Sequence, residues 1–495
     1  MIKEQKQYRS ILKATSIFGG VQIISIVFKI IGSKFVAIIL GPAGIGVLSL
    51  FNSSISFISS LTNFGIGASA VKNISVAKSS GDQRQVNLVA SLIKKIVWLT
   101  GSFGAVFIFC FSSFASKLTF GNVDYNYAFM FLSLALLINQ LTIGEKVLLQ
   151  GLRKINFLAK STIISSLITL IVTIPLYYFY ELDGIVPGII LTSLISLLIT
   201  FYYSRKLNIS KVNLSLKETL NKGKNMMFMG VMISLGGMMS SGAAYIIRIY
   251  INNSGGEEEV GLFNAGFAIV NTYVGLVFAA MATDYYPRLS AVSNNNFLTK
   301  EAINQQATIS ILILAPILLT FLIFIKWFII ILYSTKFLAI SSMIYWAALG
   351  VFFKAVSWSI GFVFLSKGNS KLYFWNELIA TSYTLALNIL GYYYLGLVGL
   401  GISFLLSYIL HLFQVYIVTR IKFNFRLEYN LIKIFIIQFC IAVFAFLFTT
   451  YIDSNLKYIP GLILIFCSLF YSYLEINKRI DISGLIRNKL FKNGK

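Results

Sequence analysis

The feature that most constrains this chain is its recurring apolar runs. A window of about 19 residues finds fourteen of them, each long enough to cross a bilayer as a helix. They lie near residues 14–40, 44–71, 88–115, 125–151, 157–179, 184–204, 226–251, 260–284, 307–332, 338–365, 370–395, 398–420, 431–452 and 458–476. With 57% hydrophobic and only 12% charged residues, the chain is predicted to be an all-α polytopic membrane protein with about 14 transmembrane helices.

Basic residues are distributed unequally between the connections of these spans. The formal net charge is +24, with 41 Lys and Arg against 17 Asp and Glu. If the N-terminus is cytoplasmic, three of the 41 fall in outer connections, six fall within spans, and the remaining 32 are cytoplasmic. Because Lys and Arg favour cytoplasmic loops, this asymmetry predicts an even number of spans with both termini cytoplasmic. It also accounts for the basic composition without a nucleic-acid partner.

The connections are too short to support several other classes of function. The inner connection 205–225 is basic but too small for a catalytic domain, so we expect no enzyme. No nucleotide-binding glycine loop followed by Lys and Ser or Thr occurs, so ATP-driven transport has no support. The three cysteines lack metal spacing, and we expect no metal and no cofactor. The single histidine, His411, falls in an apolar run, where we favour a packed residue over a proton relay.

Two pairs of segments indicate an internal repeat, with chance similarity as the alternative. LLQGLRKINFLAK (148–160) resembles FLSKGNSKLYFWN (364–376), which pairs Lys154 with Lys371 at an offset of 217 residues. YYFYELDGIVPGI and YYYLGLVGLGI pair Gly184 with Gly399 at an offset of 215. Transporters often contain such repeats. We therefore predict an N-terminal six-helix bundle (1–205), a basic cytoplasmic linker (206–225), a C-terminal six-helix bundle (226–420), and two additional helices with a basic cytoplasmic tail (421–495).

Charged residues inside the spans are the candidate functional residues, because a charge at a helix centre costs about 3 kcal/mol on insertion scales. Arg248 lies near the outer end of its span, 214 residues after Lys34, and its alternative role is to snorkel to the interface. Lys29 and Lys354 lie nearer mid-span, where either surface is harder to reach. The six cations within spans are Lys29, Lys34, Lys146, Arg248, Lys326 and Lys354.

Acidic residues are scarcer within the spans. Glu145 and Glu377 are the two clear cases, and each is either an ion-coupling carboxylate or the charge partner of a neighbouring lysine. Six cations against two acids predict a positive interior. Such an interior suits an anion such as phosphate or pyrophosphate, which Lys and Arg bind through charge-assisted hydrogen bonds.

Several motifs resemble those of a known transporter family. LGPAGIGVLSL follows the first span, and FGNVDYN precedes the fourth. AYIIRIYI, EEEVGLFNAGFAIVNTY and DYYPRLS follow in the second half. Their order and spacing across residues 10–420 resemble the Wzx-type flippases for O-antigen and related lipid-linked oligosaccharides, which are members of the multidrug/oligosaccharidyl-lipid/polysaccharide (MOP) exporter superfamily.

The resemblance implies a V-shaped, two-lobed transporter that moves undecaprenyl-pyrophosphate-linked repeat units across the bacterial inner membrane by alternating access. It implies a cationic central cavity that Lys34 and Arg248 fit by position, whereas Lys29 and Lys354 are added from their depth in the spans. The implied partners are the lipid-linked oligosaccharide and membrane lipids, with polysaccharide polymerase or assembly proteins as candidates, and a monomer is the family expectation. The alternatives are a multidrug or organic-ion antiporter or a lipid II-type flippase of the same superfamily, and, outside it, a membrane-embedded sugar enzyme or a non-transporting scaffold.

Overall fold

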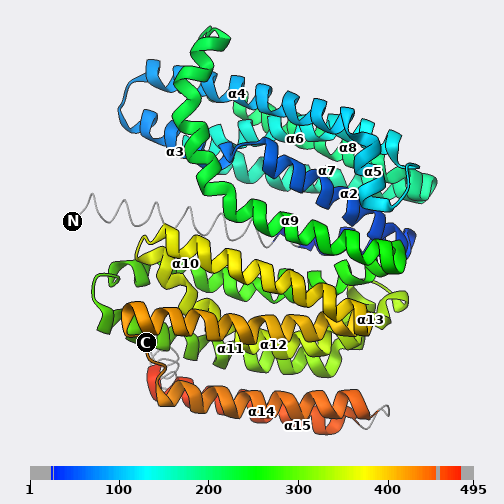
Figure 1. The fold of residues 1–495 in the computed structure, drawn as a ribbon, viewed down its shortest axis with the longest axis vertical. Helices are drawn as coiled ribbons and strands as arrows, with labels where there is room; N and C mark the ends of the chain where they lie inside the picture. The colour runs from blue at the N-terminus through cyan, green and yellow to red at the C-terminus, as the bar shows by residue number, and fades with distance from the viewer. Residues whose placement is uncertain (1–23, 26, 453–456, 481–495) are drawn as a thin grey trace, which may run out of the picture. The chain divides into compact units, whose positions relative to one another are not determined.

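A computed structural model describes residues 24–25, 27–452 and 457–480. Within these ranges the chain folds into α-helices and short 3₁₀ and π turns, with no β-strand (Figure 1). The prediction of an all-α chain is therefore confirmed. The two termini, which we expect to be cytoplasmic, and the start of the first predicted span lie outside the described residues.

The first half of the chain forms the helices predicted from its apolar runs. Residues 27–39 are helical and are followed by α2 (Gly41–Thr62) and the shorter α3 (Ile66–Ser79). α6 packs against both α4 and α8 (Figure 1). The remaining helices are α4 (Gln83–Cys110), α5 (Ser112–Phe120), α6 (Asn126–Gly151), α7 (Ile155–Tyr180) and, after the turn η1 (Glu181–Gly184), α8 (Ile185–Arg205).

The second half contains two very long helices, each interrupted by one glycine. α9 (Leu216–Ala268) is broken at Gly256 and α13 (Ser370–Phe423) at Gly396, both with positive φ. The others are η2 (Ile269–Tyr273), α10 (Gly275–Ala291), α11 (Asn296–Leu332), η3 (Thr335–Ile340), α12 (Ser341–Ser366), α14 (Tyr429–Tyr451) and α15 (Tyr458–Ile480).

Ten stretches of the described chain are long and apolar enough to cross a membrane. Three of them have 51, 58 and 54 residues. At about 1.5 Å per residue these are more than twice as long as a hydrocarbon core of about 30 Å, so each holds two crossings, separated at Glu181, Gly256 or Gly396. The ten stretches thus hold thirteen crossings, and the helix at residues 27–39 is the described part of the first of the fourteen predicted spans.

The helices of the two halves correspond at a constant offset. α6 begins at Asn126 and α12 at Ser341, 215 residues later, and both have 26 residues. α7 begins at Ile155 and α13 at Ser370, again 215 residues later. The break after α7 at Glu181 (φ 46°) corresponds to the break at Gly396 (φ 56°). These matches support the internal repeat.

The turn before α7 gives the register of the repeat. Arg153 (φ 57°) corresponds to Gly368 (φ 67°). The backbone N–H of Lys154 donates to Leu149 and that of Asn369 to Phe364, so both turns have the same hydrogen bond five residues back. The structural partner of Lys154 is therefore Asn369. The pairing of Lys154 with Lys371 at an offset of 217 is therefore wrong by two residues. It aligns the two lysines, whereas the shared turn aligns Lys154 with Asn369.

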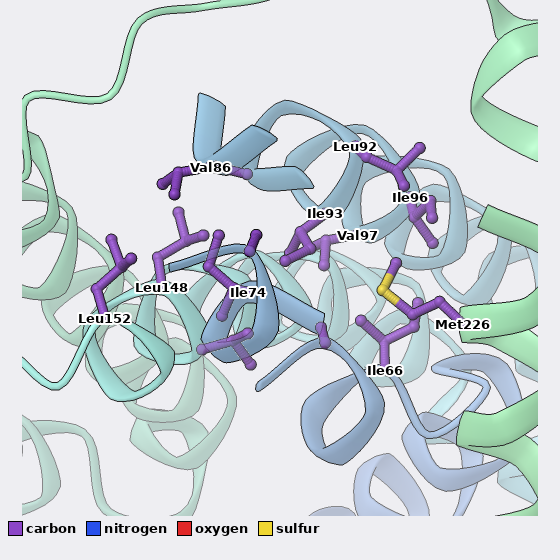
Figure 2. Packing of buried hydrophobic residues seen from close by; sticks show 14 of the residues in the cluster. Ile66, Ile74, Val86, Leu92, Ile93, Ile96, Val97, Leu148, Leu152 and Met226 are labelled. Carbon is purple, nitrogen blue, oxygen red and sulfur yellow. The ribbon is translucent and has the colours of Figure 1, made fainter. Parts of the chain in front are cut away.

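The chain divides into two compact units, Met1–Gly261 with Leu332–Ser334, and Leu262–Ile331 with Thr335–Lys495. The division falls inside α9, whereas the sequence placed the boundary at the linker 206–225. In the first unit, α3, α4 and α6 share a buried apolar cluster that includes Ile74, Ile93 and Leu148 (Figure 2). Met226 of α9 joins it, which attaches the start of α9 to this unit.

The predicted linker is docked along α4. Asn87 Oδ1 accepts from the backbone N–H of Ser210 (3.2 Å), and Ser91 Oγ from that of Val212 (2.9 Å). Lys95 Nζ donates to the carbonyl of Leu214. Side chains four residues apart lie about 6 Å apart along a helix, and alternate residues of an extended segment about 6.6 Å apart. The spacings match, so the linker lies along one face of α4.

Candidate functional site

Arg248 lies on the side of α9 that packs within the first unit. Three residues before it, the buried Tyr245 hydrogen-bonds with Thr119 of α5 and packs against Phe57 of α2, with ring centroids 5.6 Å apart. Four residues after it, Asn252 Nδ2 donates to the carbonyl of Thr119 (3.1 Å). Residues three and four apart share a helix face, so the half-buried Arg248 lies on this packed side.

The guanidinium group of Arg248 turns back along its own helix. Its Nη1 donates to the carbonyl of Ala244 at 2.7 Å, one turn toward the start of α9. The nearer end of the predicted span, where a snorkelling side chain would reach the interface, lies in the opposite direction near Asn252. The contact therefore favours an inward-directed cation over snorkelling.

Lys29 and Lys34 both lie in the helix at residues 27–39, where Lys29 is exposed and Lys34 half-buried. At the offset of 215, Lys34 corresponds to Ile249 and not to Arg248. The sequence pairing of the two cations at an offset of 214 is therefore off by one residue, about 100° around a helix. Arg248, Lys34 and Lys29 belong to the first unit, and Lys354 belongs to the second.

Lys354 of α12 is surrounded by neutral groups. Its Nζ donates to Asn271 Oδ1 at 2.9 Å, and it lies 5.1 Å from the ring centroid of Tyr408. The rings of Phe278 and Phe404 are 5.6 and 5.7 Å from the same nitrogen. Aromatic faces attract a cation without neutralising it. No carboxylate forms an ion pair with Lys354 in the described part of the chain, so no described counter-charge offsets the cation.

The two candidate carboxylates differ in their surroundings. Glu145 Oε1 lies 3.0 Å from Lys94 Nζ of α4, and the hydroxyl of Ser204 donates to its other oxygen. This supports the charge-partner interpretation of Glu145, with Lys94 rather than the adjacent Lys146 as its partner. Glu377 is half-buried in α13 and forms no ion pair with any described residue.

Asn271 is a further candidate site residue, which the pattern of charged residues in the sequence does not single out. It lies in the π turn η2 and supplies the polar contact of Lys354 across 83 residues of sequence. An amide within the apolar run AIVNTYVG was a visible signal, since such residues rarely lie in a membrane span without a partner. Its partner was not visible, because that depends on the packing of α12 against η2.

Comparison with known proteins identifies the class and then the family. The chain shares its fold with the lipid II flippase MurJ in an inward closed conformation, with a TM-score of 0.68 at 13% identity over 94% of this chain and 99% of that one. An inward-facing multidrug resistance MATE family transporter of the MOP superfamily has a TM-score of 0.66 at 15% identity, over 83% and 96% of the two chains. The chain therefore has the same fold as these two membrane transporters.

The polysaccharide biosynthesis protein family matches residues 11–293, more than half of the 495 residues. The chain belongs to this family. It is also similar to a putative O-antigen transporter of Shigella flexneri, at 25% identity over 299 residues that cover 59% of this chain and 69% of that protein. These relatives are transporters and flippases, not enzymes.

Proposed function

We propose that this protein is a flippase that carries an undecaprenyl-pyrophosphate-linked oligosaccharide, the repeat unit of O-antigen or a related polysaccharide, across the bacterial inner membrane. Alternating access by the two units moves the glycan and pyrophosphate while the polyprenyl tail stays in lipid. Family membership and the similarity to a putative O-antigen transporter support this substrate class. Both termini are cytoplasmic in this proposal.

The observation that carries the proposal is the uncompensated charge of Lys354. A lysine inside an apolar helix is costly unless it faces a partner or a cavity, and its described contacts are an amide oxygen and three aromatic rings. The missing counter-charge suits a pyrophosphate. In this proposal Lys354, Arg248, Lys34 and Lys29 bind the pyrophosphate, with Arg248 able to form a bidentate contact.

A lipid II-type flippase is the second candidate. The likeness to MurJ extends over 94% of this chain, whereas the likeness to the MATE transporter extends over 83%. Both candidates bind a polyprenyl pyrophosphate. They differ in the glycan, which the assay distinguishes.

The test is complementation in two strains, one lacking its O-antigen flippase and one depleted of its lipid II flippase. Export of surface polysaccharide in the first strain alone is the expected result. Rescue of the second strain alone would assign the protein to lipid II, and rescue of neither, at membrane abundance matched to a functional control flippase, would overturn the proposal.

A further inference from the structure

The second half of α13 carries a line of polar side chains on one helix face. Ser407, His411 and Gln414 follow at spacings of four and three residues, which places them on one side of the helix. The hydroxyl of Ser407, Nδ1 of His411 and Oε1 of Gln414 are all buried and have no hydrogen-bond partner among the described residues. Buried polar atoms are costly unless another group or an ordered water satisfies them.

This line faces the first half of α13. Gln414 Nε2 donates to Oδ1 and to the carbonyl of Asn376 at 2.8 and 2.9 Å. Tyr383 lies seven residues after Asn376, and Ser407 lies seven residues before Gln414. Because the two halves are antiparallel, Tyr383 and Ser407 lie at the same level. The hydroxyl of Tyr383 is also buried without a partner in the described structure. Unsatisfied polar atoms from both halves therefore lie at one level of the interface.

One end of the polar line leads to Lys354. The rings of His411 and Tyr408 lie 6.2 Å apart, and Lys354 Nζ lies 5.1 Å from the Tyr408 ring. Asn271, which accepts from Lys354, has a buried Nδ2 that no described group satisfies.

The other end leads to Glu377, which follows Asn376 directly. Tyr373 and Tyr383 on the same half of α13 lie near the carboxyl group of Glu377. From the second half, Tyr408 neighbours Tyr383, and from α12, Lys354 neighbours His411. A half-buried carboxyl group in an apolar span, with no cation paired to it, is less costly in its protonated form than as a carboxylate.

The other half of the repeat lacks these groups. At the offset of 215 the counterparts of Asn376, Glu377, Tyr383, His411 and Gln414 are Ser161, Thr162, Ile168, Ser196 and Ile199. The helix hairpin of α7 and α8 therefore forms without a carboxyl, an imidazole or an amide at these positions. Packing of the hairpin does not require the polar line.

We propose that the interface between the two halves of α13 is a water-filled polar path that joins Glu377 to Lys354, with Glu377 as its proton-binding group. Waters satisfy the buried atoms of Tyr383, Ser407, His411 and Gln414, and a proton bound at Glu377 is taken up and released through them. His411 acts here as a neutral hydrogen-bonding group. The use of this proton to drive the cycle rests on the proposed flippase function, whereas proton binding itself does not.

Proton binding is measured without any substrate, by infrared difference spectroscopy of the purified full-length protein between alkaline and acidic buffer. The expected result is a carbonyl stretching band of a buried protonated carboxyl group that appears on acidification and is lost in Glu377→Gln. The matched control is Glu145→Gln, which removes the carboxyl paired with Lys94 and keeps the band. A band unchanged in Glu377→Gln, or no band in the wild type, would overturn the assignment to Glu377.

Water in the path is measured by thiol labelling. Ser407→Cys is made in a chain whose Cys110, Cys440 and Cys467 are replaced by Ala, and membranes are treated with a small, charged, water-soluble methanethiosulfonate. The control is Thr192→Cys, the counterpart of Ser407 in the first unit, where the native hydroxyl donates to Ile189 at 3.0 Å. We expect labelling at least tenfold faster at position 407. Equal rates, or no labelling at 407, would overturn the water-filled path.

Discussion

Gly46 and Gly261 pack against each other in a reciprocal contact. A Cβ atom on Gly46 would lie 1.8 Å from the carbonyl oxygen of Glu257, and one on Gly261 would lie 1.8 Å from that of Pro42. The two glycines are 215 residues apart, and each lies five residues after a glycine with positive φ, Gly41 or Gly256. The same turn thus occurs in both halves of the repeat, and its two copies approach so closely that neither tolerates a side chain.

Alanine at either glycine is expected to destabilise the protein. Gly46→Ala and Gly261→Ala each force backbone apart, and overpacking of this kind costs about 1–3 kcal/mol. We expect a lower Tm for each variant of the detergent-purified protein, measured by intrinsic fluorescence. The control is Gly236→Ala in α9, where a Cβ meets nothing within 4 Å. Equal Tm values for all three variants would contradict the close contact.

Arg248→Ala is expected to reduce export of the lipid-linked repeat unit by about 10- to 100-fold, because loss of a charge-assisted hydrogen bond costs about 1.5–3 kcal/mol. Arg248→Lys keeps the charge and is expected to retain part of the activity. Export is measured in flippase-deleted cells at matched membrane abundance, with Lys211→Ala, an exposed cation of the linker, as control. Normal export by Arg248→Ala would exclude a phosphate contact at this position.

Lys354→Met keeps an unbranched side chain, one atom shorter than that of lysine, and removes its charge. The aromatic surroundings of Phe278, Phe404 and Tyr408 suit an apolar side chain, so we expect the protein to retain its Tm while export falls at least about tenfold, the equivalent of about 1.4 kcal/mol. Unchanged export would show that the cation is not used in transport. A lower Tm with normal export per folded molecule would assign Lys354 to packing.

Loss of the linker contacts is expected to expose residues 206–215. Asn87→Ala with Ser91→Ala removes two hydrogen-bond acceptors of the linker backbone, at about 1 kcal/mol each. We expect faster hydrogen exchange at the amides of Ser210 and Val212. Arg84→Ala, an exposed change on the same helix, serves as control. Exchange as slow as in the wild type would mean that the remaining contacts, including that of Lys95 with the carbonyl of Leu214, are enough to hold the linker.

Glu377→Gln is expected to uncouple transport from a pH gradient. Inverted membrane vesicles are prepared from flippase-deleted cells that have accumulated the lipid-linked repeat unit. Wild-type flux is expected to rise with an imposed pH gradient, whereas flux through Glu377→Gln stays the same with and without it. Thr162→Val, the counterpart in the first unit, keeps the gradient response. A full response in Glu377→Gln, or a response to sodium in place of protons, would contradict the prediction.

The sequence by itself determined the class of this protein and the position of its spans. A membrane helix must satisfy its own backbone hydrogen bonds, so its presence depends on a local run of about 20 apolar residues, and such runs can be counted along the chain. The interruptions at Gly256 and Gly396 fall between predicted spans, because the apolar runs end close to these two glycines. The motifs from LGPAGIG to DYYPRLS likewise indicated the superfamily from short segments.

Only the tertiary structure decided how the charged and polar side chains are paired. Glu145 pairs with Lys94 and not with its neighbour Lys146. Lys354 donates a hydrogen bond to Asn271, which lies 83 residues away in the sequence. The linker docks on α4 because the spacing of side chains along α4 matches the spacing of backbone N–H groups along the linker. Partners of this kind depend on which helix faces meet. Hydropathy locates a helix but leaves its rotation and neighbours open, since lipid and an apolar helix are nearly equivalent surroundings for its side chains.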